Sequence, residues 1–134
     1  MIITDTDEFD SILPLLKTNV KHNLNDAELS RTKMIDLSWG KYEITNEIGK
    51  VHTIIASDVV YQTKACQPLV YNILELSTQT TDVITYYKRR LLKEDKIFEL
   101  LKNAGFYQIR SIDSSEMFQK VYNAYILHFT RNEM

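Results

Sequence analysis

The stretch Ala-Ser-Asp-Val-Val-Tyr, residues 56–61, places an acid and a tyrosine directly after an apolar run. That run, residues 51–56, is rich in β-branched side chains, which is typical of a buried strand. An acid at the end of such a strand, here Asp58, either caps the next element or faces a site. Tyr61, three residues further on, would share that site. The helices and strands predicted around this stretch have to distinguish a cap from a site.

Other nucleophiles and metal ligands are few and scattered. Cys66 is the single cysteine, and the three histidines, His22, His52 and His128, belong to no CxxC or HExxH pattern. The sequence therefore predicts no disulfide and no metal site. Cys66 with a distant histidine would make a thiol nucleophile, but a small, partly buried residue is the simpler interpretation. A lone cysteine fits a reducing compartment, so we expect the protein in the cytoplasm, with the nucleus as a further location.

Length and charge narrow the class of protein. The chain has 134 residues, of which 44% are hydrophobic and 25% charged, and this suits one globular domain. A net charge of −2 gives no broad basic field, so no nucleic-acid partner is expected. No apolar run approaches the roughly 20 residues that span a bilayer. The first residues include acids where a signal peptide would be basic, so no membrane partner is expected.

Two-residue and 3.6-residue periods alternate along the whole chain. Strands are predicted for residues 2–4, 33–39, 51–57, 82–87, 106–112 and 121–130. Helices are predicted with a first turn at Pro14, from near Pro68, and over residues 92–104, where Gly105 ends the last one. This alternation favours an α/β domain with a mostly parallel sheet. The short gap between the last two strands favours an antiparallel hairpin.

Four motifs in order carry a family resemblance. They are "ITDTDEFDSILPLLKTNVKHN" at residues 3–23, "LSWG" at 37–40, "ASDVVY" at 56–61 and "FELLKNAGF" at 98–106. Together they resemble the class I, seven-stranded methyltransferases that use S-adenosylmethionine, and among these the protein-lysine methyltransferases of family 16. The resemblance covers nearly the whole chain. It implies a Rossmann-like, mostly parallel sheet with an antiparallel C-terminal hairpin.

The resemblance implies roles for five residues. Asp5, at the end of its strand, matches the acid that binds the ribose hydroxyls of the cofactor. Trp39 matches the tryptophan beside the adenine, and Ser57 the small residue that lines the cofactor pocket. Asp58 and Tyr61 match the signature that borders the methyl-transfer site. From the residues alone, turn acids, a core aromatic and a surface tyrosine remain open as alternatives.

The implied reaction is methyl transfer from S-adenosylmethionine to a lysine side chain of a protein substrate. The amine must lose its proton and approach in line, so positioning is the main task of the protein. Asp58 would orient the incoming lysine, and Tyr61 would hold its amine by a hydrogen bond or a cation–π contact.

One motif of the family is missing. A glycine-rich loop after the first strand lets the backbone approach the methionine half of the cofactor. This chain has three glycines and no Gly-x-Gly. The resemblance therefore implies that residues 1–134 are a single, N-terminally truncated domain without the first strand and helix. Because that strand lies between the second and fourth in the family, we expect a two-strand piece and a four-strand piece with open edges.

Two functions from different classes are compatible with the sequence. The first is the C-terminal part of a lysine methyltransferase. The second is a catalytically inactive remnant that acts as a protein-interaction module. A dimer or another chain would cover the missing strand. A basic cluster, residues 88–90 with Lys93 and Lys96, either faces an acidic protein substrate or is a solvated surface.

Overall fold

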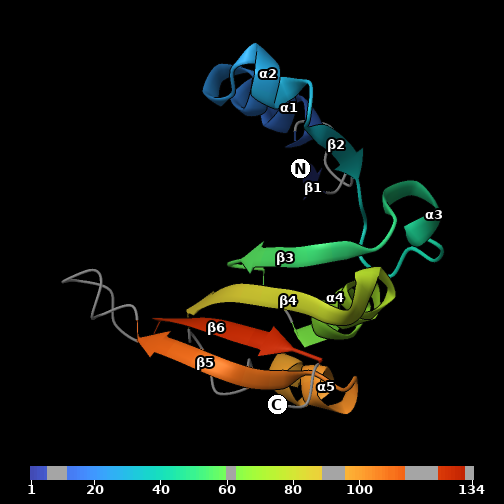
Figure 1. Ribbon diagram of the computed structural model, residues 1–134, viewed down its shortest axis with the longest axis vertical. Helices are drawn as coiled ribbons and strands as arrows, with labels where there is room; N and C mark the ends of the chain where they lie inside the picture. The colour runs from blue at the N-terminus through green and yellow to red at the C-terminus, as the bar shows by residue number, and fades with distance from the viewer. Residues whose placement is uncertain (6–11, 60–62, 89–95, 114–123, 132–134) are drawn as a thin grey trace. The chain divides into compact units, whose positions relative to one another are not determined.

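The computed structural model describes residues 1–5, 12–59, 63–88, 96–113 and 124–131. Its elements are β1 (Ile2–Asp5), α1 (Ile12–Asn23), α2 (Asp26–Leu29), β2 (Lys33–Asp36), α3 (Thr45–Ile48), β3 (Val51–Ser57), α4 (Thr63–Leu76), β4 (Ser77–Lys88), α5 (Lys96–Asn103), β5 (Tyr107–Asp113) and β6 (Ala124–Thr130) (Figure 1). The structure contains all six predicted strands and the three longer helices, but β2 ends at Asp36 and not at residue 39, and β4 begins at Ser77 and not at residue 82. Residues 92–95 of the last predicted helix and 121–123 of the last predicted strand lie outside the described residues. The chain divides into unit 1, Met1–Lys41, and unit 2, Tyr42–Met134.

Unit 1 contains the two-stranded sheet. β1 and β2 pair in parallel, and α1 connects them with Pro14 in its first turn, where a proline costs no intrahelical hydrogen bond. A short helix that was not predicted, α2, follows α1. Asn25 forms its capping box: the side chain accepts a hydrogen bond from the Glu28 N–H at 3.0 Å, and the Glu28 carboxylate accepts one from the Asn25 N–H at 2.9 Å. Asn25 therefore begins a helix as well as following one.

Unit 2 contains the four-stranded sheet, in the order β3-β4-β6-β5. β3 and β4 are parallel, whereas β6 is antiparallel to both β4 and β5. The predicted antiparallel hairpin of the last two strands is confirmed. So is the division into one two-stranded and one four-stranded sheet, because the strands of the described residues form these two sheets and no third.

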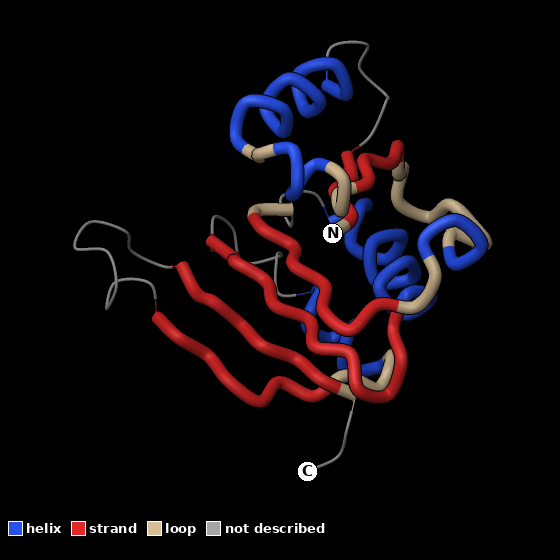
Figure 2. The backbone as a smooth tube through the Cα atoms, turned by 45° about the horizontal axis from the view of Figure 1, so that its top comes forward, coloured by secondary structure: helices blue, strands red, loops and turns tan. Residues whose placement is uncertain are grey.

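Helix α5 covers one face of the sheet of unit 2. Its Phe98 ring meets Tyr87 of β4 edge to face at 5.1 Å and stacks on Phe129 of β6 at 6.0 Å. Residues of β4 with odd numbers from Thr81 to Tyr87 are buried, while their even-numbered neighbours are partly exposed. Figure 2 shows α4 and α5 behind the four strands. The buried face of the sheet is therefore the face that carries these helices.

Gly105 ends α5 as predicted. Its φ of 86° lies in the left-handed region, which glycine adopts without the penalty that a Cβ imposes. The Phe106 N–H donates to the Leu101 carbonyl at 2.9 Å, and the Gly105 N–H donates to the Lys102 carbonyl at 3.0 Å. This Schellman motif turns the chain so that the side chains of Phe106 and Leu101, each 1% exposed, enter the core together.

Helix α4 begins earlier than predicted. Its first residue is Thr63, so Pro68 lies inside the helix and not at its start. Proline has no N–H to donate to the carbonyl four residues before it, and this cost normally favours a later start. Here the extra turn carries Cys66, which is only 2% exposed and continues the buried stripe of Leu69 and Ile73. Burial of that stripe outweighs the lost hydrogen bond.

Candidate functional site

The stretch that follows β3 adopts an uncommon backbone conformation. Asp58 has a φ of 51°, which is rare for a residue with a Cβ and is often found near functional sites. Its N–H donates to the carbonyl of Tyr86 in β4 at 3.1 Å. Just before it, the hydroxyl of Thr85 donates to the Ala56 carbonyl at 2.8 Å. These bonds hold the carboxyl end of β3 in place and leave Ser57 and Asp58 exposed.

Two further residues lie at this end of the sheet, and only Tyr86 was not singled out by the sequence. Tyr86 is the register partner of Ser57, and Lys88 ends the same strand with an exposed side chain. The only signal for Tyr86 was the strand prediction for residues 82–87, because the register between two strands cannot be predicted from one of them alone. Lys88 belongs to the predicted basic cluster. Tyr61 lies outside the described residues, as do residues 89–90 and Lys93 of that cluster.

The two remaining predicted residues lie in unit 1. Asp5 is the exposed last residue of β1 and pairs in register with Asp36, the last residue of β2. Its carbonyl accepts a hydrogen bond from the Leu37 N–H at 2.8 Å. Trp39, two residues further on, is half-buried. Asp5 and Trp39 thus lie at the carboxyl end of the parallel strands of unit 1, as Ser57 and Asp58 do in unit 2, which is the end where open α/β sheets bind ligands.

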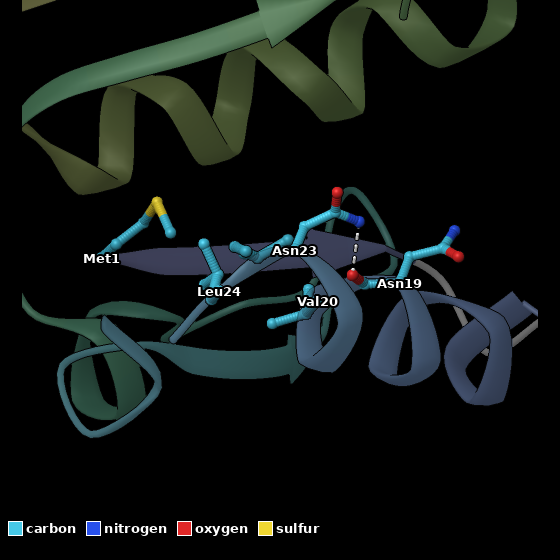
Figure 3. Close-up of a pocket in the computed structure, with 6 residues that line it drawn as sticks. Met1, Asn19, Val20, Asn23 and Leu24 are labelled. Atoms are coloured by element: carbon cyan, nitrogen blue, oxygen red, sulfur yellow. Dashed lines mark hydrogen bonds between the residues drawn. The ribbon is translucent and has the colours of Figure 1, made fainter. Parts of the chain in front are cut away.

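Unit 1 also contains an open hollow of about 220 Å³ between β1 and α1 (Figure 3). It is lined by Met1, Ile3, Asn19, Val20, Asn23 and Leu24. The Asn23 amide donates to the Asn19 carbonyl at 2.7 Å, so this amide is occupied within α1. None of the predicted site residues lines the hollow.

The titratable groups outside the strand ends offer little chemistry. Burial raises the pKa of the Cys66 thiol, and the nearby Lys96 opposes this only in part. A buried thiol with a raised pKa is a poor nucleophile, which agrees with the structural interpretation of Cys66. His128 Nε2 lies 2.7 Å from the Asp82 carboxylate on the face opposite α5. The described segments hold no group of three or more His, Cys, Asp or Glu side chains placed to bind a metal ion.

None of the described helices is both long and apolar enough to span a membrane.

Comparison with known proteins places the chain in a family. The sequence model of a lysine methyltransferase family matches residues 1–104. Protein N-lysine methyltransferase METTL21A of Xenopus tropicalis is 26% identical over 100 residues, which are 75% of this chain and 45% of the frog protein. The chain therefore spans about half the length of that curated relative.

Solved structures agree on the fold. The glycopeptide N-methyltransferase MtfA matches with a TM-score of 0.76 at 10% identity, and the match covers 98% of this chain and 73% of the MtfA chain. A TehB-like SAM-dependent methyltransferase from Corynebacterium glutamicum has a TM-score of 0.66 at 13% identity, covering 98% of this chain and 67% of its own. The mixed sheet with its antiparallel hairpin is the Rossmann-like fold of these methyltransferases. Since the family model covers more than half of its residues, the chain belongs to the lysine methyltransferase family.

Proposed function

We propose that this chain is the part of an S-adenosylmethionine-dependent protein-lysine methyltransferase that receives the substrate lysine and the adenosine half of the cofactor. The observation that carries the proposal is the exposed pair Ser57 and Asp58 at the carboxyl end of β3, with Asp58 held at a φ of 51°. The family match over residues 1–104 supports the reaction class. MtfA, one of the proteins with the same fold, has been solved in complex with S-adenosyl-L-homocysteine.

The residues present fit one half of the cofactor. Asp5 offers an exposed carboxylate at a strand end for the ribose diol, and Trp39 offers an indole face for the adenine. When bound, S-adenosylmethionine supplies an electrophilic methyl group. For the methionine half, the family uses a glycine-rich loop. Among the described residues, Gly40, Gly49 and Gly105 each occupy a positive-φ turn elsewhere. None of them therefore forms the glycine-rich loop.

In the proposed function, Asp58 orients the substrate lysine and favours loss of its proton. The amine needs a free lone pair to react, and a carboxylate within hydrogen-bond reach both positions the amine and accepts the proton. Tyr61 holds the same amine through its hydroxyl or its ring face. Ser57 leaves room for the cofactor because its side chain is small.

The proposed substrate is a protein with acidic residues around the target lysine. Lys88 is exposed at the carboxyl end of β4, next to the carboxyl end of β3 where Ser57 lies. Lys96 is exposed at the start of α5. Positive side chains beside a site raise the encounter rate with an acidic partner. The proposal includes a cytoplasmic location, with the nucleus as a further one. A dimer, or another chain that pairs with an open sheet edge, belongs to the same proposal.

A catalytically inactive remnant that serves as an interaction module is the second candidate. The absence of any Gly-x-Gly from the sequence favours it. Calorimetry of residues 1–134 with S-adenosylmethionine separates the two candidates. A dissociation constant in the micromolar range supports the enzyme, whereas no detectable heat supports the remnant.

The role of Asp58 is tested by methyl transfer to acidic lysine-containing protein substrates. Asp58→Ala is expected to lower the rate at least about 100-fold, the usual range for a lost acid–base group. Asp113→Ala serves as a matched control, because Asp113 is the last residue of β5 just as Asp58 follows β3. Equal rates for the Asp58 variant and the unmodified protein would remove Asp58 from the proposal.

A further inference from the structure

Two tyrosines of unit 2 form an aromatic corner on its surface. The rings of Tyr42 and Tyr71 meet edge to face, with their centroids 5.2 Å apart and an angle of 69° between their planes. Tyr42 is 75% exposed and Tyr71 is 38% exposed, so neither ring is buried in the core. A ring as exposed as that of Tyr42 keeps at least one face open to solvent. The pair therefore offers two aromatic walls, set at a steep angle, to a ligand.

Two carboxylates lie beside this aromatic corner. Glu43 follows Tyr42 in the chain, and Glu75 lies one turn after Tyr71 on the same side of α4. Partial desolvation raises the pKa of the Tyr71 hydroxyl, and Glu75, Tyr42 and Glu43 raise it further. Both carboxylates are therefore near enough to make the electrostatic field at the rings negative, which favours a cationic ligand.

The charge of Glu75 is only weakly compensated. Its Oε1 accepts hydrogen bonds from the N–H and the hydroxyl of Thr45, both at 3.3 Å, and these donors are neutral. Its Oε2 is buried and has no hydrogen-bond partner among the described residues. The Lys50 ammonium donates to the main-chain carbonyl of Glu75 at 2.6 Å, near the end of α4. A partly buried carboxylate held by neutral donors is stabilised by a further cation close to it.

The backbone holds Glu43 in a fixed position next to Tyr42. Its φ of 60° lies in the left-handed region, which among the described non-glycine residues only Asp58 shares. Ile44, the next residue, is 1% exposed and anchors the chain in the core. The exposed Glu43 carboxylate accepts a hydrogen bond from the Asn46 amide at 3.5 Å, which is a long distance for such a bond. Because a carboxylate accepts several hydrogen bonds, Glu43 retains capacity for a ligand.

We propose that the aromatic corner of Tyr42 and Tyr71 binds an arginine side chain of a protein partner. The guanidinium stacks on an exposed ring face, the Glu43 carboxylate accepts its N–H groups, and Glu75 adds negative potential. A guanidinium is planar and weakly hydrated, so it binds on an open surface. The ammonium of a lysine is compact and strongly hydrated, and this open corner would not remove its water.

The inference goes beyond the proposed function and does not rest on it. None of the four residues takes part in methyl transfer. The two surfaces also differ in the charge that they attract, because Lys88 at the carboxyl end of β4 favours acidic residues, whereas the aromatic corner favours a basic one. A partner with an arginine outside the acidic surroundings of its target lysine would use both surfaces.

The test uses residues 1–134 with one defined probe. The probe is a capped hexapeptide of alternating glycine and arginine, added without cofactor and at low ionic strength, where surface charges are least screened. Nuclear magnetic resonance follows the ring protons of the tyrosines. We expect saturable shifts for Tyr42 and Tyr71. The same peptide with lysine in place of arginine should bind at least about threefold more weakly, because it retains the charge but stacks less well.

Matched variants separate this surface from the rest of unit 2. The double variant Tyr42→Ala, Glu43→Gln is expected to weaken binding of the arginine peptide about fivefold, through loss of an exposed cation–π contact and an exposed ion pair. The control, Tyr107→Ala with Glu99→Gln, also removes one exposed ring and one exposed carboxylate, and should leave binding unchanged. Both should retain the far-UV circular dichroism of the unmodified chain, because all these side chains are exposed.

A conservative change tests whether the ring or the hydroxyl binds. Tyr42→Phe keeps the ring face and should bind the arginine peptide within about twofold of the unmodified chain. Three results would overturn the inference: unchanged ring signals of Tyr42 and Tyr71 at saturation, equal binding of the arginine and lysine peptides, and equal loss of binding in the two double variants. Absence of S-adenosylmethionine binding would count against the proposed function and leave this inference in place.

Discussion

Unit 1 and unit 2 differ in how much apolar surface each removes from water. Among the described residues, the buried apolar side chains of unit 1 are Val20, Ile35 and Leu37, whereas unit 2 has fifteen. Unit 1 has a two-stranded sheet, which is at best marginally stable by itself, and unit 2 has four strands with two packed helices. The stability of the chain therefore resides mainly in unit 2. The predicted site residues Asp5 and Trp39 therefore belong to the less stable unit, and Ser57 and Asp58 belong to the more stable one.

The largest expected effect comes from the core of unit 2. Phe106→Ala removes a side chain that is 1% exposed, and we expect it to lower the free energy of unfolding of unit 2 by about 3–5 kcal/mol. Urea unfolding followed by far-UV circular dichroism measures this. Trp39, the single tryptophan, lies in unit 1 and reports on that unit by fluorescence.

If the two units unfold separately, this experiment should give two results. In the unmodified chain, the fluorescence of Trp39 should change at lower urea than the circular dichroism, and Phe106→Ala should shift only the latter. A single transition seen by both probes, moved equally by the substitution, would mean that the units unfold as one and that their difference in burial does not matter.

The second prediction concerns the turn that ends α5. Gly105→Ala places a Cβ at a φ of 86°. Apart from residue 105 itself and its two neighbours in the chain, no described atom lies within 4 Å of that Cβ, so the cost is conformational and not steric. We expect unit 2 to lose about 1–2 kcal/mol. Lys102→Ala, at an exposed position of the same helix, is the control and should change stability by less than about 0.5 kcal/mol. Equal effects of both changes would contradict the role given to the turn.

The third prediction concerns the cap of α2 in unit 1. Asn25→Ala removes the acceptor for the Glu28 N–H and should cost unit 1 about 1 kcal/mol, seen as an earlier fluorescence transition of Trp39. Asn19→Ala, at an exposed position within α1, is expected to leave this transition in place. If Asn25→Ala instead shifts the circular dichroism of unit 2, the two units are coupled more strongly than their cores suggest.

The smallest effect is a pH dependence confined to unit 2. Burial raises the pKa of Cys66 above its ordinary value of 9.0, so the native state holds this proton more tightly than the unfolded chain. The stabilisation is complete below the unfolded pKa and is lost as pH rises through the folded pKa. Unit 2 should therefore lose stability as the pH rises above the ordinary thiol pKa of 9.0. Cys66→Ala should flatten this dependence, and a slope that persists in the variant would assign it to another group.

Local patterns predicted much of the fold. The period of two located β2, the continuous apolar run located β3, and Gly105 located the end of α5, because these signals depend on neighbours in the sequence. The start of α4 was misplaced at Pro68, since burial of Cys66 depends on partners distant in the chain. The family resemblance predicted two separate sheets, and the described strands form two.

The candidate site was predicted less completely. Asp5 and Asp58 were placed at strand ends because acids follow apolar runs there, and both are found at those ends. Tyr86 was not singled out, because its position next to Ser57 follows from strand register, a property of two segments together. The role of Tyr61 stays a prediction.

The sequence by itself determined where the chain turns and that an acid follows β3. These features arise from side-chain volume, polarity and backbone freedom within a few residues. The prediction from sequence of a buried strand at residues 51–56 was wrong, because in β3 only Ala56 is buried and Ile55 is 75% exposed. Only the tertiary structure decided that Asp58 adopts a positive φ near Tyr86 and that Ile55 of β3 is exposed. Those features depend on which strands pair and which faces stay bare, and pairing is settled by contacts between segments that are far apart in the sequence.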